Sequence, residues 1–323
     1  MGLPVRVCGI GVARSPDDGA GASEGFARRL AETVAAVSPP GAQVRLFHMI
    51  EEAAVLAARD ALVAGGVGLP FGGDTIGVVL GVEEGIDGIK AEYFRGILKD
   101  GPLGASPIAF PFTTPNTIAA RIAILLDLRG ENATVSGGSL SGAQALGLAL
   151  ESLRGGRCGA ALAGGATWVQ PIFLDALAVV GRRASGQAGW GAGFLFLKSE
   201  ATSAGNVDGL GQLLGYAEGV GKDDIRDAVQ GCLQDAGLAC ERIESVRVAS
   251  TSDPRSLVEA LHGAGARVPI VQSPSSFLYA ASFPMAVAEA MEQATDATTG
   301  PVLVVGTDCL AGAAAAIVRR GGF

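Results

Sequence analysis

Short runs of apolar and β-branched residues recur along the whole chain and alternate with segments whose apolar positions have helical spacing. The runs lie at 5–13, 75–82, 132–137, 158–166 and 191–199 in the first half, and at 211–219, 245–250, 268–273, 301–308 and 313–320 in the second half. Helical patterns between the later runs cover residues 222–236, 254–265 and 284–294. Continuous apolar runs are typical of strands that are buried on both faces. The alternation therefore predicts an α/β fold.

The alternation is interrupted near residue 205. The segment ATSAGNVDG, residues 201–209, is small and polar, which is typical of a surface connection. Strand and helix patterns alternate on both sides of this segment. We therefore expect two similar α/β halves, residues 1–204 and residues 205–323.

One predicted corner between a strand and a helix places Ser139 where chemistry often occurs. NATVSGG, residues 132–138, is a strand pattern that ends in two glycines, and Gly155–Gly156 end the helical pattern that follows. Apolar residues have helical spacing in between, namely Ala143, Leu146, Leu150 and Leu153. Ser139 thus precedes a helix of about four turns, a position where nucleophiles are found. The same position also fits a small residue that caps the helix through its side-chain oxygen.

Composition narrows the class of protein. Of the 323 residues, 49% are hydrophobic and 17% are charged, which excludes a chain that stays disordered. The 24 Lys and Arg against 32 Asp and Glu give a net charge of -8, and no dense basic run is present. A nucleic-acid partner is therefore not expected.

A membrane location is not expected either. The least charged long stretch, residues 158–181, contains only Asp175 but is interrupted by Gly164, Gly165 and Pro171. It fits a strand followed by a helix better than a membrane span. The N-terminus runs directly into an apolar strand pattern and lacks the basic start and apolar core of a signal peptide. We expect a cytoplasmic protein.

The cysteines and histidines indicate neither a metal site nor a bound cofactor. The five cysteines contain no C-x-x-C pair and are interpreted as free structural thiols: Cys8, Cys158, Cys232, Cys240 and Cys309. The two histidines, His48 and His262, do not have the spacing of zinc ligands. His262 falls late in a predicted helix, and both histidines are interpreted as surface or packed residues.

The string RGENATVSGGSLSGAQALGLALESLRGGRCGAALAGGATW, residues 129–168, resembles the nucleophile region of the β-ketoacyl synthases of the thiolase superfamily. PFTTPNTIAARIAILLDLRG, residues 111–130, resembles the family's segment before the nucleophile. ASGQAGWGAGFLFLKSE, residues 184–200, resembles its glycine-rich stretch. The resemblance implies a thiolase-like αβαβα layered fold of two related halves, the second half being shortened. It also implies a dimer, for which we expect the strand at 158–166 to form the central contact.

The resemblance also implies which positions carry catalysis in the family, and this sequence departs from them. The nucleophilic cysteine falls on Ser139, and the two catalytic histidines fall near Ser250 and near Phe277. Gln272 takes the place of a lysine that accompanies the second histidine. Decarboxylating condensation uses a thiolate to take the acyl chain and histidines to stabilise the developing enolate. The chain therefore lacks the expected Cys/His/His set.

A second departure lies in the C-terminal loop. Cys309-Leu310-Ala311-Gly312 replaces the Gly-Phe-Gly-Gly turn of ketosynthases, and thiolases proper carry a cysteine base in a corresponding loop. Cys309 is therefore a further candidate for a catalytic role beside Ser139, with an inert buried thiol as the alternative. Ser250, Phe277 and Leu310 are candidates for the wall of a substrate site.

Three functions remain open at this stage. The first is a non-catalytic partner subunit, similar to the chain length factors that pair with active ketosynthases in aromatic polyketide and polyene biosynthesis. The second is a divergent acyltransferase or decarboxylase that uses Ser139, with Cys309, Asp308, Asp253 and Ser250 as candidate bases. The third is a homodimeric scaffold without a ligand. The expected partner is an active ketosynthase or a second copy of the chain, with an acyl carrier protein as a further partner.

Overall fold

The strands of this computed structural model coincide with the predicted apolar runs. The structure describes residues 3–14, 32, 35, 49–68, 75–83, 85–179, 189–199, 209–221, 223–250, 259, 261–263, 269–273, 279–292, 300–307 and 312–321. Its strands are β1 (Val5–Arg14), β2 (Ile76–Val82), β3 (Asn132–Val135), β4 (Ala160–Val169), β5 (Gly189–Ser199), β6 (Gly211–Val220), β7 (Ser245–Ser250), β8 (Ile270–Gln272), β9 (Val302–Thr307) and β10 (Gly312–Arg320). All ten strand predictions are confirmed.

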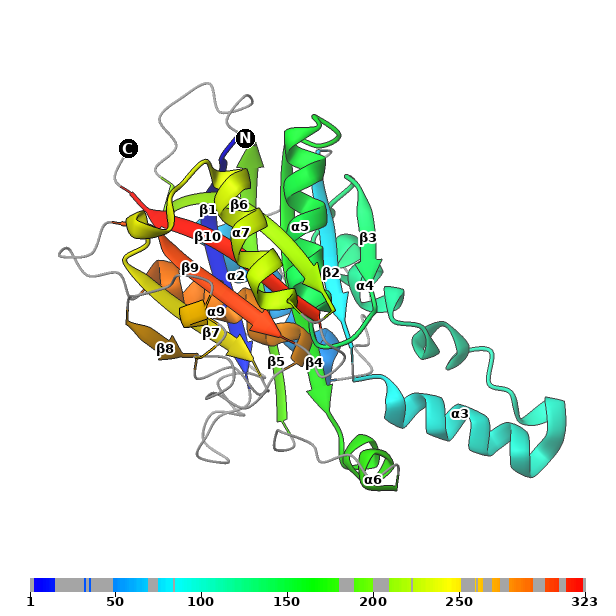
Figure 1. Ribbon diagram of the computed structural model, residues 1–323. Coiled ribbons are helices and arrows are strands. Elements are labelled where there is room, and N and C mark those ends of the chain that lie inside the picture. Colours follow the sequence, from blue (N-terminus) through cyan, green and yellow to red (C-terminus); the bar gives the residue numbers. More distant parts are fainter. Residues whose placement is uncertain are drawn as a thin grey trace.

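The helices connect these strands and cover both faces of the sheet (Figure 1). They are α2 (Met49–Ala64), α3 (Asp87–Asp100), α4 (Asn116–Leu125), α5 (Ser141–Arg154), α6 (Pro171–Val179), α7 (Asp224–Ala236) and α9 (Ser282–Glu292). Short 3-10 helices are η1 (Gly101–Gly104), η2 (Phe110–Thr113), η4 (Cys240–Arg242) and η5 (Tyr279–Ala281). The helices predicted after Ser139, at 222–236 and at 284–294 are confirmed. Most of the helix predicted at 254–265 lies outside the described residues.

The strand topology is the same in the two halves of the chain. The strands pair in the order β3-β2-β4-β5-β1-β6-β10-β9-β7-β8. In the first half, β2 runs parallel to β3 and β4, and β5 runs antiparallel to β4 and β1. In the second half, β7 runs parallel to β8 and β9, and β10 runs antiparallel to β9 and β6. The boundary predicted at 204/205 lies outside the described residues and stays a prediction.

Three apolar clusters show that the two halves of the sheet are separate layers. One cluster packs α2 and α4 against β2, β4 and β5, and a second packs α5 and α9 between the two halves. A third packs α7 against β6, β7, β9 and β10. The order is thus helix, sheet, helix, sheet, helix. The predicted αβαβα fold is confirmed.

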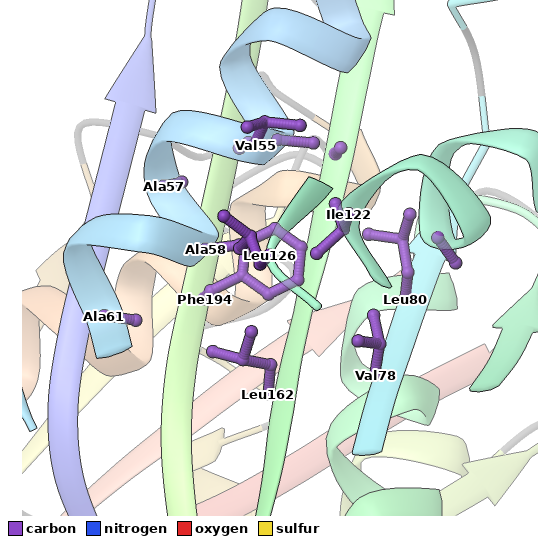
Figure 2. Close-up of a cluster of buried hydrophobic side chains, with 14 of the residues drawn as sticks. Val55, Ala57, Ala58, Ala61, Val78, Leu80, Ile122, Leu126, Leu162 and Phe194 are labelled. Carbon is purple, nitrogen blue, oxygen red and sulfur yellow. The ribbon is translucent and has the colours of Figure 1, made fainter. Parts of the chain in front are cut away.

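The outer cluster of the first half is built around close contacts between small residues. Figure 2 shows Phe194 of β5 surrounded by Ala58 of α2, by Leu126, which directly follows α4, and by Leu162 of β4. A Cβ atom at Gly9 or Gly11 of β1 would clash with backbone carbonyl oxygens of α2. Glycine in β1 therefore lets α2 lie directly on the strand.

Arg154, at the end of α5, joins the two halves. Its guanidinium donates to the Asp235 carboxylate of α7 at 2.8 Å, to the carbonyl oxygen of Leu3 at 2.7 Å and to that of Leu214 at 3.1 Å. Both charged side chains are mostly buried. Beside this cluster, β1 and β6 form the short antiparallel pair that connects the half-sheets.

The prediction that residues 158–166 form the central dimer strand is wrong. β4, which contains most of these residues, pairs with β2 on one side and β5 on the other. Its backbone groups are therefore used within the chain, and its small apolar residues serve burial on both faces. Among the described strands of this half, β3 is the one with a free edge, because it pairs only with β2.

Within the described parts of the chain, we find no helix with the length and apolar character to span a bilayer.

Candidate functional site

Ser139 lies in a tight corner between β3 and α5. β3 ends at Val135, and Gly138 has a φ of 104°, which favours glycine. Leu140 is buried and directly precedes the first residue of α5, Ser141. Ser139 is half-buried. The glycine and the buried leucine thus place the Ser139 side chain at the start of a helix in the central layer, as predicted.

The prediction that Ser139 caps the helix is wrong, because Ser141 stabilises the corner instead. The Ser141 hydroxyl accepts a hydrogen bond from the Gly137 amide at 2.9 Å and donates to the Gly138 carbonyl at 2.6 Å. Leu140, the residue in the N-cap position, makes no side-chain cap. Within the described part of the chain, we find no hydrogen-bond partner for the Ser139 hydroxyl.

We expect Ser139→Ala to change the free energy of unfolding by less than about 0.5 kcal/mol, because the side chain makes no described hydrogen bond. Ser141→Ala is the matched control. It removes a fully buried hydroxyl that makes two hydrogen bonds, and we expect a loss of about 1–3 kcal/mol. Chemical denaturation of both variants measures the difference. An equal loss from both would contradict this description of the corner.

A second corner, at the start of α9, lies against the first. Tyr279 has a φ of 43° and precedes α9 by three residues, as Gly138 precedes α5. A Cβ atom at Gly142 of α5 or Gly165 of β4 would clash with the carbonyl oxygen of Ala280. The starts of both central helices therefore meet beside the middle of β4, and glycine permits this approach.

The ends of β7 and β9 complete this region. A Cβ atom at Gly306 of β9 would lie 3.0 Å from the Ala249 carbonyl oxygen and 3.3 Å from the Leu140 side chain. Ser250 is the last residue of β7 and pairs with Thr307 of β9. The backbone at Ser250 is therefore close to the Ser139 corner, as the resemblance implies. The other predicted site residues lie outside the described residues, and their roles stay predictions: Phe277, Cys309, Leu310, Asp308 and Asp253.

Three polar residues beside this corner were not predicted from the sequence. The Gln144 amide of α5 donates to the Glu218 carboxylate of β6 at 3.1 Å, and the Tyr216 hydroxyl donates to the same carboxylate at 2.8 Å. The Gln144 Oε1 atom lies 3.6 Å from where a Cβ atom of Gly137 would be. Burial raises the pKa of Tyr216, and Glu218 adds to this effect, so the phenol stays a donor. Gln144 and Glu218 are 74 residues apart, and no local pattern relates them.

The described cysteines fit the interpretation as structural thiols. Cys8, Cys158, Cys232 and Cys240 form no disulfide. Burial raises the pKa of each thiol, which lowers its reactivity as a nucleophile. His262 is exposed, and His48 lies outside the described residues. No metal-binding group of three His, Cys, Asp or Glu side chains occurs among the residues the structure describes.

An arm projects from the edge of the first half-sheet. It consists of α3, η1 and η2, residues 87–113, and α3 stands away from the rest of the molecule (Figure 1). No residue of α3 is buried. Large apolar side chains are exposed along the arm: Phe94 (58%), Leu98 (87%), Leu103 (97%), Ile108 (72%) and Phe110 (56%). α4 contacts both η2 and β3, the strand with the free edge.

Comparison with known proteins agrees with this arrangement. The family model described as β-ketoacyl synthase, N-terminal domain, matches residues 40–183, which include the Ser139 corner and the arm. Residues 40–183 are therefore similar to this ketosynthase domain. The spectinabilin polyketide synthase system protein NorC of Streptomyces orinoci is 30% identical over 192 residues, which are 51% of this chain. The match covers only 8% of that much longer protein.

Solved structures with similar folds cover nearly the whole chain. The ishigamide ketosynthase/chain length factor has a TM-score of 0.73 at 22% identity, over 99% of this chain and 100% of that one. A type II polyketide synthase ketosynthase in complex with its acyl-carrier protein has a TM-score of 0.78 at 15% identity, over the same shares. A β-ketoacyl synthase from Burkholderia phymatum STM815 has a TM-score of 0.77 at 18% identity, over 100% of both chains.

Proposed function

We propose that this ketosynthase-like chain is a partner subunit of the chain length factor type. It pairs with an active β-ketoacyl synthase in polyketide, polyene or fatty-acid-like biosynthesis and does not condense acyl units by itself. The two halves, residues 1–204 and 205–323, form one subunit of the pair. One of the similar structures holds a ketosynthase with its acyl-carrier protein. By analogy, we propose that an acyl carrier protein delivers substrates to the complex of this chain with its ketosynthase.

The Ser139 corner is the observation that carries the proposal. The corner has the geometry of a nucleophile position, but it presents a hydroxyl with no hydrogen-bond partner among the described residues. A serine hydroxyl needs a base to take its proton before it attacks a thioester. A general base supplies a rate factor of about 10²–10⁴. The described histidine, His262, is exposed and belongs to a predicted helix rather than to a loop of the site.

The arm and the edge of β3 support the choice of partner. The arm presents five large apolar side chains to solvent, and exposed apolar patches mark interaction sites. β3 adds an unpaired strand edge beside it, which can accept a strand from a neighbouring subunit. A partner of the same fold fits this combination. In a two-fold arrangement, its own apolar arm and its own β3 edge would face the same features of this chain.

Coexpression tests the proposal. The tagged chain is purified together with an untagged ketosynthase from the same gene neighbourhood, and the mass of the complex is measured. We expect a one-to-one complex that forms ketoacyl product from malonyl and acyl carriers, whereas the isolated chain forms none. Ketoacyl product from the isolated chain would contradict the proposal, as would failure of every neighbouring ketosynthase to bind.

The second candidate function uses Ser139 as an acyl acceptor. One observation favours it: the half-buried hydroxyl lies free at the start of α5, where the helix dipole favours developing negative charge. Incubation with acyl thioesters followed by mass spectrometry distinguishes the two functions. An adduct on Ser139 that is lost in Ser139→Ala would replace the partner-subunit proposal with an acyltransferase or decarboxylase.

A further inference from the structure

Gln170, at the end of β4, joins the base of the arm to the rest of the protein. Its side-chain Oε1 atom accepts a hydrogen bond from the Gly88 amide in the first turn of α3 at 2.7 Å. Its backbone carbonyl oxygen accepts hydrogen bonds from Phe173 and Leu174 in the first turn of α6. Gln170 is only 6% exposed. One residue therefore holds the starts of two projecting helices.

The arm has two further anchors, because Ile89 of α3 packs against the outer apolar cluster and η2 contacts α4. α3 packs against η1 and η2, which are parts of the arm itself, and against α6. Its base begins at Gly85, whose φ of 133° is accessible to glycine but not to other residues. The Gly85 amide contacts the Asp87 carboxylate at 3.4 Å, within the arm base. Gly88 and Gln170 are 82 residues apart in the sequence. Their hydrogen bond thus attaches the start of α3 to the end of β4.

We propose that Gln170 is a positioning residue that holds the arm in the orientation in which it docks on the partner ketosynthase. The proposal rests on the function proposed above. A docking surface that is already oriented loses less conformational freedom on binding, so the same contacts produce a higher affinity. A freely moving arm would present the same apolar side chains but would have to be ordered by the partner.

The occupant is a ketosynthase-fold subunit because the apolar arm and the unpaired β3 edge belong to the same half of the chain, and α4 contacts both η2 and β3. The arm exposes five large apolar side chains, and β3 has an unpaired edge. A short peptide or a small ligand would cover one of these features and leave the other exposed. A folded subunit with a sheet edge of its own covers both.

Two variants remove the contact from opposite sides. Gln170→Leu keeps the approximate volume but removes the acceptor, and Gly88→Ala places a Cβ atom 2.8 Å from the Oε1 position and displaces the flexible amide. We expect each to weaken the complex with the partner ketosynthase about tenfold, measured as the dissociation constant. Hydrogen exchange of the isolated chain is expected to become faster at residues 87–100 and to stay unchanged in the strands.

Gln212→Leu is the matched control. Gln212 is also buried and accepts a hydrogen bond from Arg319 at 2.6 Å, but it lies in β6 at the junction of the half-sheets. We expect its dissociation constant to stay within about twofold of the wild type. Faster exchange throughout the chain in Gln170→Leu would show general destabilisation and overturn the positioning role.

The outcomes separate the two proposals. If the wild-type chain binds no ketosynthase, the proposed function fails, whereas hydrogen exchange in the isolated chain still tests whether Gln170 orders the arm. If the wild-type chain binds and Gln170→Leu binds with equal affinity, the role of Gln170 is wrong and the proposed function stands. Intrinsic fluorescence provides a check of the fold, because the two tryptophans of the sequence, Trp168 and Trp190, are paired across β4 and β5 near Gln170.

Discussion

Replacing Leu98 and Leu103 together with aspartate is expected to weaken binding of the partner ketosynthase at least about 100-fold. Both side chains lie on the arm, and they are 87% and 97% exposed in the isolated chain. The substitutions therefore remove nothing from the core, but they place two charges where the partner would bury apolar surface. A buried charge without a partner strongly opposes association. Titration of the tagged ketosynthase measures the dissociation constant.

Leu3→Asp is the control for this prediction. Leu3 is 70% exposed and precedes β1, and the N-terminal end of the chain lies far from α3 (Figure 1). We expect it to leave the dissociation constant within about threefold of the wild type. Undiminished binding by the double aspartate variant would show that the arm is not the docking surface.

Phe194→Ala is expected to lower the free energy of unfolding by about 3–5 kcal/mol. Phe194 is completely buried in β5, at the centre of the cluster formed by α2, α4 and the first half-sheet (Figure 2). Gly164 lies opposite it in β4, and a Cβ atom there would contact the Phe194 ring at 2.9 Å. The neighbouring strand thus supports the ring closely, and alanine would leave a cavity. Denaturant unfolding monitored by circular dichroism measures the loss.

Phe94→Ala makes the same chemical change on the surface. Phe94 lies on the arm and is 58% exposed, with one edge-to-face contact to Tyr93. We expect a loss of less than about 1 kcal/mol. Similar losses from the two variants would contradict the layered arrangement of the core.

The second-half partners of the Ser139 corner could be predicted only through the resemblance. Ser250 ends β7 next to Thr307 of β9, and the neighbouring Gly306 lies close to the Leu140 side chain of the corner. Ser139 does not cap the helix, and the hydroxyl that stabilises the corner is that of Ser141. Both serines fit the sequence pattern, and the choice depends on the turn at Gly138, which directs the Ser141 hydroxyl back to Gly137.

The arm shows a similar limit. Residues 87–100 mix charged and apolar residues, and no buried face gives them a clear helical pattern. None of these residues is buried, because the described parts of the chain do not cover α3 on any side. A sequence pattern does not show which surfaces of a helix are covered in the folded protein. The contact between Gly88 and Gln170 likewise joins residues that are far apart in the chain.

The sequence by itself determined the ten strands, the main helices of the central layer and the position of the Ser139 corner. These features depend on local patterns, because a strand buried on both faces must be continuously apolar and a helix must repeat its apolar positions. Tertiary structure alone decided that β3, and not β4, has a free edge in the described part of the first half. The run at 158–166 is as apolar as a dimer contact would be, but β2 and β5 use both of its edges. A continuously apolar sequence indicates that a strand is buried. Which strands pair with it depends on how the whole chain packs.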